Sequence, residues 1–234
     1  MKDQMLDALN AGLPELGLDL PENIRNTLCD FGTGVVKQNE VMNLTAITEP
    51  DRVAKLHLLD SLSILTVADL DGKRLIDVGC GAGFPGVPVK IACPGVKLTL
   101  LDSLGKRMNW LESFLPTLGI DAEYVTARAE EAVASRRESY DFATSRAVAR
   151  LNILLELTAP YVKVGGCVLA MKGSAAREEL AEAKNAIAKL GLKLEKVADF
   201  QVEDGTHSVI VLRKVKSTPA QYPRRYAKIK QAPL

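Results

Sequence analysis

The chain has 234 residues, of which 47% are hydrophobic, so it is long and apolar enough to form one globular unit with a full core. It contains no run of roughly 18 uninterrupted apolar residues and opens on charged and polar residues, so we expect a cytoplasmic protein with neither a membrane partner nor a leader. Four scattered cysteines and only two histidines predict neither a disulfide framework nor a metal site.

The net charge of +1 hides an asymmetry along the chain. Residues 1–72 carry five Lys/Arg against twelve Asp/Glu, whereas residues 205–234 carry seven Lys/Arg and no acid. This distribution indicates either a surface that meets a polyanion or a solvated polar tail, and charge alone does not separate the two.

Residues 1–67 are expected to form an N-terminal helical extension, because apolar residues recur there at helical spacing. The recurring positions are Leu6, Leu9, Leu13 and Leu16, followed by Ile24, Leu28, Phe31 and Val35.

From Lys73 onward, short apolar runs alternate with helical stretches. The predicted strands are 74–78, 97–101, 122–126, 140–144, 167–171, 194–200 and 208–212, and the predicted helices are 106–118, 150–159 and 176–190. This alternation predicts an α/β fold, a Rossmann-like parallel sheet covered on both faces, with the ligand beyond the carboxyl ends of the strands. We place this domain at 68–216 and a basic C-terminal tail at 217–234.

The most informative segment is Asp77-Val-Gly79-Cys-Gly81-Ala-Gly83-Phe-Pro-Gly86, where the first strand should turn into a helix. Glycines there let the backbone approach a bulky ligand. Residues 81–86 also match the G-x-G-x-x-G dinucleotide pattern, which is weak evidence when it stands alone.

Asp102 ends the second predicted strand 19 residues after Gly83. A carboxylate at that place can accept hydrogen bonds from the ribose hydroxyls of either NAD or S-adenosylmethionine. The acidic Asp77 before the first glycine favours S-adenosylmethionine, because it would help to hold a cationic ligand and would repel a pyrophosphate.

Taken together, several segments make the chain similar to the bacterial ribosomal RNA small subunit methyltransferase G family, also called glucose-inhibited division protein B. They are Asn43-Leu-Thr-Ala-Ile47, His57-Leu-Leu-Asp60-Ser-Leu62, 77–86, Leu101-Asp-Ser103, Lys106-Arg107, Arg128-Ala-Glu130, Ser145-Arg-Ala147, Lys172-Gly173 and Tyr222-Pro-Arg-Arg225. The resemblance implies a class I methyltransferase fold, S-adenosylmethionine as cofactor, and methylation of guanine N7 in 16S ribosomal RNA. The substrate would be that RNA or a small-subunit particle, and we expect a monomer.

The resemblance also implies the site residues. With Asp77 and Gly81 of the glycine loop, the expected cofactor-binding residues are Asp77, Gly79, Gly81, Phe84, Asp102, Ala129, Glu130 and Arg146. The basic residues that can bind RNA phosphates, unless they are solvated charges, are Lys106, Arg107, Arg128, Lys172, Arg224 and Arg225. Tyr222 and Tyr226 could stack on unpaired bases. For His57 and Asp60, three residues apart, we expect a structural hydrogen-bonded pair.

No catalytic base is predicted, because guanine N7 carries a lone pair and no proton. The sequence lacks the Asp/Asn-Pro-Pro-aromatic motif of exocyclic-amine methylation, and Cys93-Pro94 reverses the Pro-Cys order used on pyrimidine carbon. Two rivals remain open at this point: an NAD-dependent oxidoreductase, and an RNA-binding assembly factor with a vestigial pocket.

Overall fold

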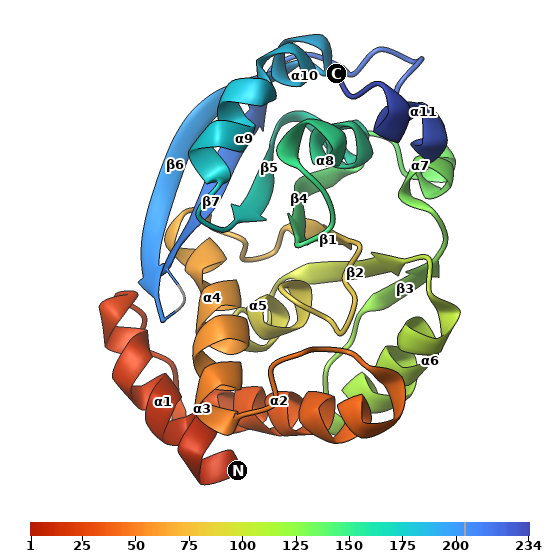
Figure 1. Cartoon of the computed structure of the whole chain (residues 1–234). Helices are drawn as coiled ribbons and strands as arrows, with labels where there is room; N and C mark the ends of the chain where they lie inside the picture. Colours follow the sequence, from red (N-terminus) through yellow and green to blue (C-terminus); the bar gives the residue numbers. More distant parts are fainter. Residues whose placement is uncertain (204) are drawn as a thin grey trace.

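A seven-stranded sheet forms the centre of the molecule (Figure 1). The computed structural model describes residues 1–203 and 205–234. The strands are β1 (Arg74–Val78), β2 (Lys97–Asp102), β3 (Glu123–Thr126), β4 (Tyr140–Arg146), β5 (Val162–Lys172), β6 (Leu192–Val202) and β7 (Gly205–Lys214). All seven predicted strands are therefore present, several of them longer than the apolar runs that predicted them.

Helices precede the sheet and alternate with its strands. The first group is α1 (Lys2–Glu15), α2 (Glu22–Met42), α3 (Pro50–Val53), the π-helical turn η1 (Ala54–Leu59), α4 (Asp60–Leu62) and η2 (Ser63–Thr66). The second is α5 (Gly86–Ala92), α6 (Gly105–Phe114), η3 (Leu115–Leu118), α7 (Ala129–Ala132), η4 (Val133–Ser135), α8 (Leu151–Thr158), η5 (Ala159–Tyr161), α9 (Ala176–Glu182), α10 (Lys184–Lys189) and α11 (Tyr226–Gln231). Among the described residues, none of these helices has the length and apolarity needed to cross a bilayer.

The strand order is β3-β2-β1-β4-β5-β7-β6. The first five strands pair in parallel, as expected, but β7 is antiparallel to both β5 and β6. The expectation of a wholly parallel sheet is thus wrong at this edge, because β6 and β7 form a hairpin rather than a βαβ unit. The order reverses between β1 and β4, which is where open α/β sheets form a ligand crevice.

Two apolar layers cover the sheet, and alternation along the strands divides the side chains between them. On β5, Cys167, Leu169 and Met171 face the layer that contains α1, α2, α5 and α6. Val168 and Ala170 face the other layer, with α8, α9, α10 and the C-terminal segment. Both faces of this strand are therefore buried, which explains its continuous apolar run.

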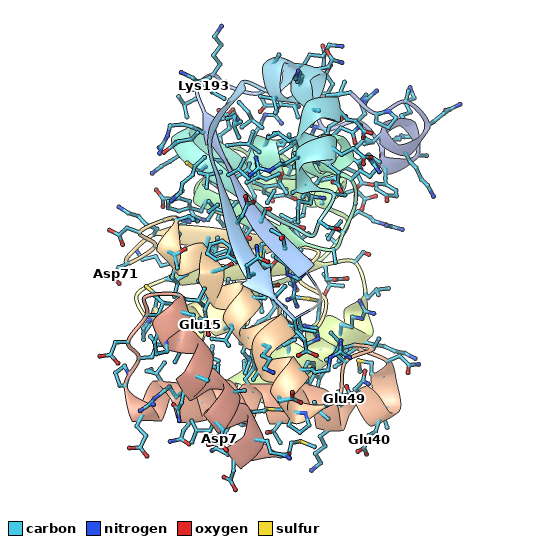
Figure 2. The ribbon with its side chains drawn as sticks, turned by 60° about the vertical axis from the view of Figure 1, so that its left-hand side comes forward. Asp7, Glu15, Glu40, Glu49, Asp71 and Lys193 are labelled. Atoms are coloured by element: carbon cyan, nitrogen blue, oxygen red, sulfur yellow. The ribbon has the colours of Figure 1, made fainter. Side chains whose placement is uncertain are left out.

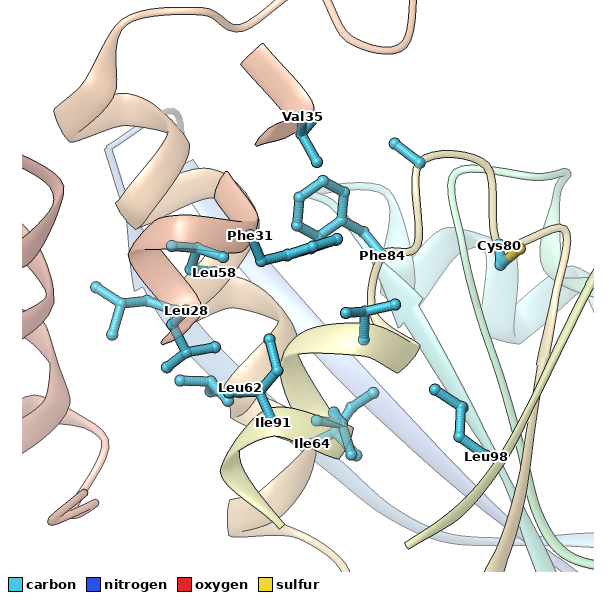
Figure 3. Close-up of a cluster of buried hydrophobic side chains, with 14 of the residues drawn as sticks. Leu28, Phe31, Val35, Leu58, Leu62, Ile64, Cys80, Phe84, Ile91 and Leu98 are labelled. Carbon is cyan, nitrogen blue, oxygen red and sulfur yellow. The ribbon is translucent and has the colours of Figure 1, made fainter. Parts of the chain in front are cut away.

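The N-terminal helices pack directly on the sheet domain and share its hydrophobic core. Leu28, Phe31 and Val35 of α2 are buried, and the ring of Phe31 meets that of Phe84 edge-on with centroids 5.3 Å apart (Figure 3). Because Phe84 belongs to the glycine loop, the helical extension supports that loop directly.

Candidate functional site

A cleft of about 480 Å³ opens at the carboxyl ends of β1, β2 and β4. Seven of the eight predicted cofactor residues line it: Gly79, Gly81, Phe84, Asp102, Ala129, Glu130 and Arg146. We call this cavity the glycine-loop cleft. Its position is the one that the reversal of strand order predicts.

The glycine loop is pinned to the end of β2. The N–H groups of Gly79 and Cys80 both donate to the carbonyl of Leu101, at 2.7 and 3.1 Å. Gly79 has a φ of +74°, and a Cβ there would stand 2.5 Å from Cγ2 of Val148. Only glycine fits this position, since any side chain would bring both backbone strain and a collision. A Cβ at Gly81 would meet only Nη1 of Arg107, at 3.8 Å, so the backbone there is open to the cleft.

The carboxylate of Asp102 faces this loop and is 8% exposed. Its Oδ2 accepts from the N–H of Gly81 and its Oδ1 from the N–H of Leu104, each at 2.9 Å. Each carboxylate oxygen offers about two acceptor positions, so the group can fix the loop and still accept hydrogen bonds from a ligand.

Asp77 is the eighth predicted residue, and the structure gives it another task. It is fully buried, and its Oδ2 accepts from the N–H of Gly86 at 2.8 Å, where α5 begins. Burial raises the pKa of Asp77 to about 7, although the Gly86 hydrogen bond and the charge of Arg146 oppose this rise. The carboxyl group therefore holds the start of the helix from behind the loop, in place of the direct ligand contact that was expected.

Arg146 closes one end of the cleft through several contacts. Its Nη1 donates to the carbonyl of Leu56 and to Oδ2 of Asp60, both at 2.9 Å. Its Nη2 lies 3.2 Å from Nδ1 of His57, and its guanidinium carbon lies 5.0 Å from the ring centroid of Phe84. The side chain is thus fixed in place before any ligand arrives.

The carboxylate of Asp60 is 4% exposed and lies between the side chains of Arg146 and His207. Its Oδ2 accepts from Arg146, and its Oδ1 lies 2.8 Å from Nδ1 of His207. Burial alone would raise the pKa of Asp60, but the His207 hydrogen bond and the charge of Arg146 lower it. The prediction that Asp60 pairs with His57 is therefore wrong, because the partners of Asp60 are Arg146 and His207.

The ring of His57 is held on both sides. Its Nε2 lies 2.8 Å from Oγ1 of Thr45, and its Nδ1 lies 3.0 Å from the carbonyl of Leu56. Burial and the charge of Arg146 lower the pKa of His57 to about 4, so the imidazole is neutral at pH 7.

A second cavity of about 520 Å³ adjoins the cleft and shares His57, Arg146, Ala147 and Val148 with it. Ala147 has a φ of +56°, a left-handed conformation that costs energy in a residue other than glycine. Such strain is concentrated at ligand sites, and here it falls on the wall between the two cavities. Sequence reasoning did not find Val148, because an apolar residue after a strand carries no chemical signal.

The far end of the glycine-loop cleft is lined by Ala129 and Glu130 at the start of α7 and by Tyr226 at the start of α11. Figure 1 shows these two helices beside each other. The carbonyl of Ala129 accepts the hydroxyl of Tyr161 at 2.5 Å, and the guanidinium carbon of Arg128 lies 5.8 Å from the ring centroid of Tyr226. Tyr226, which the sequence suggested as an RNA contact, lines the cleft together with Glu130.

The six predicted RNA contacts fall into two groups. Lys106, Arg128 and Arg225 are exposed, and Arg107 lies half-buried in the cleft lining. Lys172 and Arg224, in contrast, are held by carboxylates of the protein itself, Lys172 by Glu179 and Arg224 by Glu156. Lys172 and Arg224 therefore form ion pairs within the protein, where an RNA phosphate was expected as their partner.

The chain is similar to known proteins over nearly its full length. A family model for rRNA small subunit methyltransferase G matches residues 24–209. The Ribosomal RNA small subunit methyltransferase G of Alkaliphilus metalliredigens is 44% identical over 231 residues, 96% of each chain. The protein of the same name in Alkaliphilus oremlandii is 43% identical over 237 residues, 99% of each chain.

Solved structures with low sequence identity share the fold. M. jannaschii TYW2 in complex with AdoMet has a TM-score of 0.53 at 12% identity, over 64% of this chain and 72% of its own. A variant of the 16S rRNA (adenine(1408)-N(1))-methyltransferase from Catenulisporales acidiphilia has a TM-score of 0.53 at 16% identity, over 63% of this chain and 90% of its own.

Proposed function

Because the chain belongs to the rRNA small subunit methyltransferase G family, we propose that it transfers a methyl group from S-adenosylmethionine to N7 of a guanine in 16S ribosomal RNA. The observation that carries the proposal is the glycine-loop cleft, in which an open loop backbone faces the Asp102 carboxylate. We propose a cofactor site here and an RNA base site beside it.

The groups in the cleft fit S-adenosylmethionine. Asp102 keeps acceptor positions for the two ribose hydroxyls, and the backbone at Gly81 is open to a close-lying ligand. Ala129 and Glu130 line one end of the cleft, where their backbone and carboxylate groups can form hydrogen bonds with the edge of the adenine. Arg146 lies at the opposite end, where it can attract a carboxylate. NAD would need room for a pyrophosphate on the loop. The family model and the curated relatives are rRNA methyltransferases, which favours S-adenosylmethionine over NAD as the cofactor.

The reaction asks for position rather than proton transfer. The cofactor supplies an electrophilic methyl group on a sulfonium, and guanine N7 brings its own lone pair. His57, neutral and held at both ring nitrogens, shapes the wall between the cavities and abstracts no proton. The task of the chain is to align the two reactants, which by itself can supply a large part of a rate enhancement.

The second cavity is the proposed seat of the guanine. It shares a wall of four residues with the glycine-loop cleft, so a base inside it would border the cofactor at that wall. The exposed Lys106, Arg128 and Arg225 are the proposed phosphate contacts. Lys172 and Arg224 act structurally in this proposal, because the carboxylates of Glu179 and Glu156 already neutralise them.

The test replaces guanine by 7-deazaguanine in the small-subunit RNA, which removes the nucleophilic atom and preserves the Watson–Crick edge. We expect methyl transfer from radiolabelled S-adenosylmethionine to fall to background on both free RNA and reconstituted particles. RNA binding, measured by filter retention, should persist because phosphates supply most of the affinity.

Each rival predicts a different result. Methylation of the 7-deaza substrate at the normal residue would move the reaction to another guanine atom. An assembly factor with a vestigial pocket would bind unmodified RNA and leave its mass unchanged. An oxidoreductase would bind NADH in preference to S-adenosylhomocysteine.

A further inference from the structure

The C-terminal segment, residues 215–234, is fastened to the domain at several points. The guanidinium of Arg137 donates to the carbonyls of Thr218, Pro219 and Tyr222 at 2.9–3.0 Å. Two side chains of the C-terminal segment, Tyr222 and Ile229, are 7% and 0% exposed. The segment therefore has a defined place on the protein and is not a free basic arm.

The strongest fastening is the ion pair between Arg224 and Glu156 of α8. Glu156 is fully buried, and its Oε1 accepts from both the backbone N–H and Nε of Arg224, each at 2.8 Å. Its Oε2 accepts from Nη2 at 2.6 Å. Because an unpaired carboxylate in this position would be costly, the pair holds the chain in place two residues before Tyr226.

Tyr226 is thereby placed on the wall of the glycine-loop cleft. It lines the same cavity as Asp102, Ala129 and Glu130, and the guanidinium of Arg128 lies over its ring. A half-buried aromatic ring beside the part of the cleft suited to adenine can pack on a purine, and such contacts favour any base with a π face.

We propose that Tyr226 contacts the adenine of the cofactor, and that the Arg224–Glu156 pair positions it for this contact. The inference rests on the proposed function, because it takes S-adenosylmethionine as the ligand of the cleft. It makes the C-terminal segment part of the cofactor site, whereas the sequence suggested a role for Tyr226 in stacking on RNA bases.

The test measures S-adenosylhomocysteine binding by calorimetry without RNA. Tyr226→Ala should weaken binding about 5- to 100-fold, the range expected for loss of an aromatic ring from a base. Tyr226→Phe keeps the ring and should stay within about threefold of the wild type. The matched control is Gln231→Ala, an exposed change on the same helix, which should leave the affinity unchanged.

A second pair of variants tests the positioning role. Arg224→Ala should increase amide hydrogen exchange over residues 222–231 and should also weaken S-adenosylhomocysteine binding. If Arg224 acts through Tyr226, both changes remove the same contact with the ligand. The double variant Arg224→Ala/Tyr226→Ala should then bind S-adenosylhomocysteine no more weakly than whichever single variant has the lower affinity.

The outcomes separate this inference from the proposed function. Wild-type affinity in Tyr226→Ala would overturn the inference, and so would a loss confined to RNA binding, which would return Tyr226 to the RNA face. Failure of the wild-type protein to bind S-adenosylhomocysteine would instead contradict the proposed function.

Discussion

The carboxylate of Asp102 accepts hydrogen bonds from the N–H groups of Gly81 and Leu104, and in the proposed function it also accepts from the ribose hydroxyls of the cofactor. Asp102→Asn keeps the shape and removes the charge and half of the acceptor oxygens. A hydrogen bond to a charged group contributes about 1.5–3 kcal/mol. We therefore expect calorimetry to show S-adenosylhomocysteine binding weakened about 10- to 100-fold.

The alanine variant is less informative here, because it would leave the N–H groups of both Gly81 and Leu104 without their acceptor, whereas asparagine keeps an acceptor oxygen for one of them. Glu112→Gln, an exposed carboxylate on α6 outside the cleft lining, serves as the control and should bind like the wild type. An Asp102→Asn protein with unchanged affinity would remove the ribose role from Asp102.

Asp77 gives the fold a pH dependence with a definite sign. Its pKa rises from 3.8 to about 7 on folding, so between these values the folded protein holds a proton that the unfolded chain has lost. The stabilising contribution of this group is full below pH 3.8 and is lost progressively as the pH rises to about 7. Asparagine does not titrate, so Asp77→Asn should gain stability relative to the wild type between pH 5 and 8, by about 2–3 kcal/mol. Urea unfolding of both proteins at several pH values in this range measures the gain. If the free energy of unfolding had the same pH dependence in both proteins, the prediction would be wrong.

These two aspartates show what spacing in the sequence does and does not predict. Asp102 was predicted in the cleft because it ends the second strand, and the β1–β2 register does place Leu101 beside Val78, next to the glycine loop. Asp77 was predicted there too, yet alternation along β1 turns its side chain away from that of Val78 and under the start of α5. Burial against a later helix is a property of tertiary packing that spacing does not carry.

At the scale of the elements, apolar periodicity predicted every strand but not the direction of β7. Periodicity reports which residues are buried and is the same for parallel and antiparallel strands. The turn dipeptide Asp204-Gly205 between two apolar runs is typical of a hairpin and could have predicted the antiparallel edge. Similarly, the π-helical turn η1, which contains His57, has no distinct sequence pattern, although such turns are frequent at functional sites.

The N-terminal helices illustrate the same limit. The spacing of Leu28, Phe31 and Val35 predicted a helix with one buried face, which the structure confirms. The partner of that face, the ring of Phe84 in the glycine loop, could not be predicted, because an amphipathic pattern does not name what covers it. The apparent extension is therefore part of the support of the cleft.

Across the whole molecule, the charge asymmetry of the sequence becomes an asymmetry in space. Asp7, Glu40 and Glu49, from the N-terminal helices and the segment that follows them, lie at the lower end of the molecule in Figure 2, and the acidic Glu15 and Asp71 lie above them on the same part of the chain. The exposed residues Arg225 and Lys230 line a neighbouring cavity that shares Arg128, Glu130 and Tyr226 with the glycine-loop cleft, and Lys228 is exposed on α11 as well. A polyanion would be repelled by the first region and attracted to the second.

The last prediction uses this arrangement. Each protein cation on an RNA phosphate adds about 0.7–0.9 to the slope of log affinity against log salt. Replacing Arg225, Lys228 and Lys230 together by glutamine should make the slope shallower by about two to three units, and S-adenosylhomocysteine affinity should stay unchanged. Point changes are preferable to deleting the segment, because deletion would leave Glu156 unpaired in the core.

The matched control neutralises three exposed lysines elsewhere, Lys37 on α2 and Lys73 and Lys97 at the amino ends of β1 and β2. These two strand ends lie at the edge of the sheet opposite the cleft, so the control should keep the wild-type slope. Because both triple variants lose the same total charge, a difference between them reports local phosphate contact rather than the overall field of the protein. Equal slopes in the two variants would show that α11 does not touch RNA, and would leave Lys106 and Arg128 as the proposed phosphate contacts.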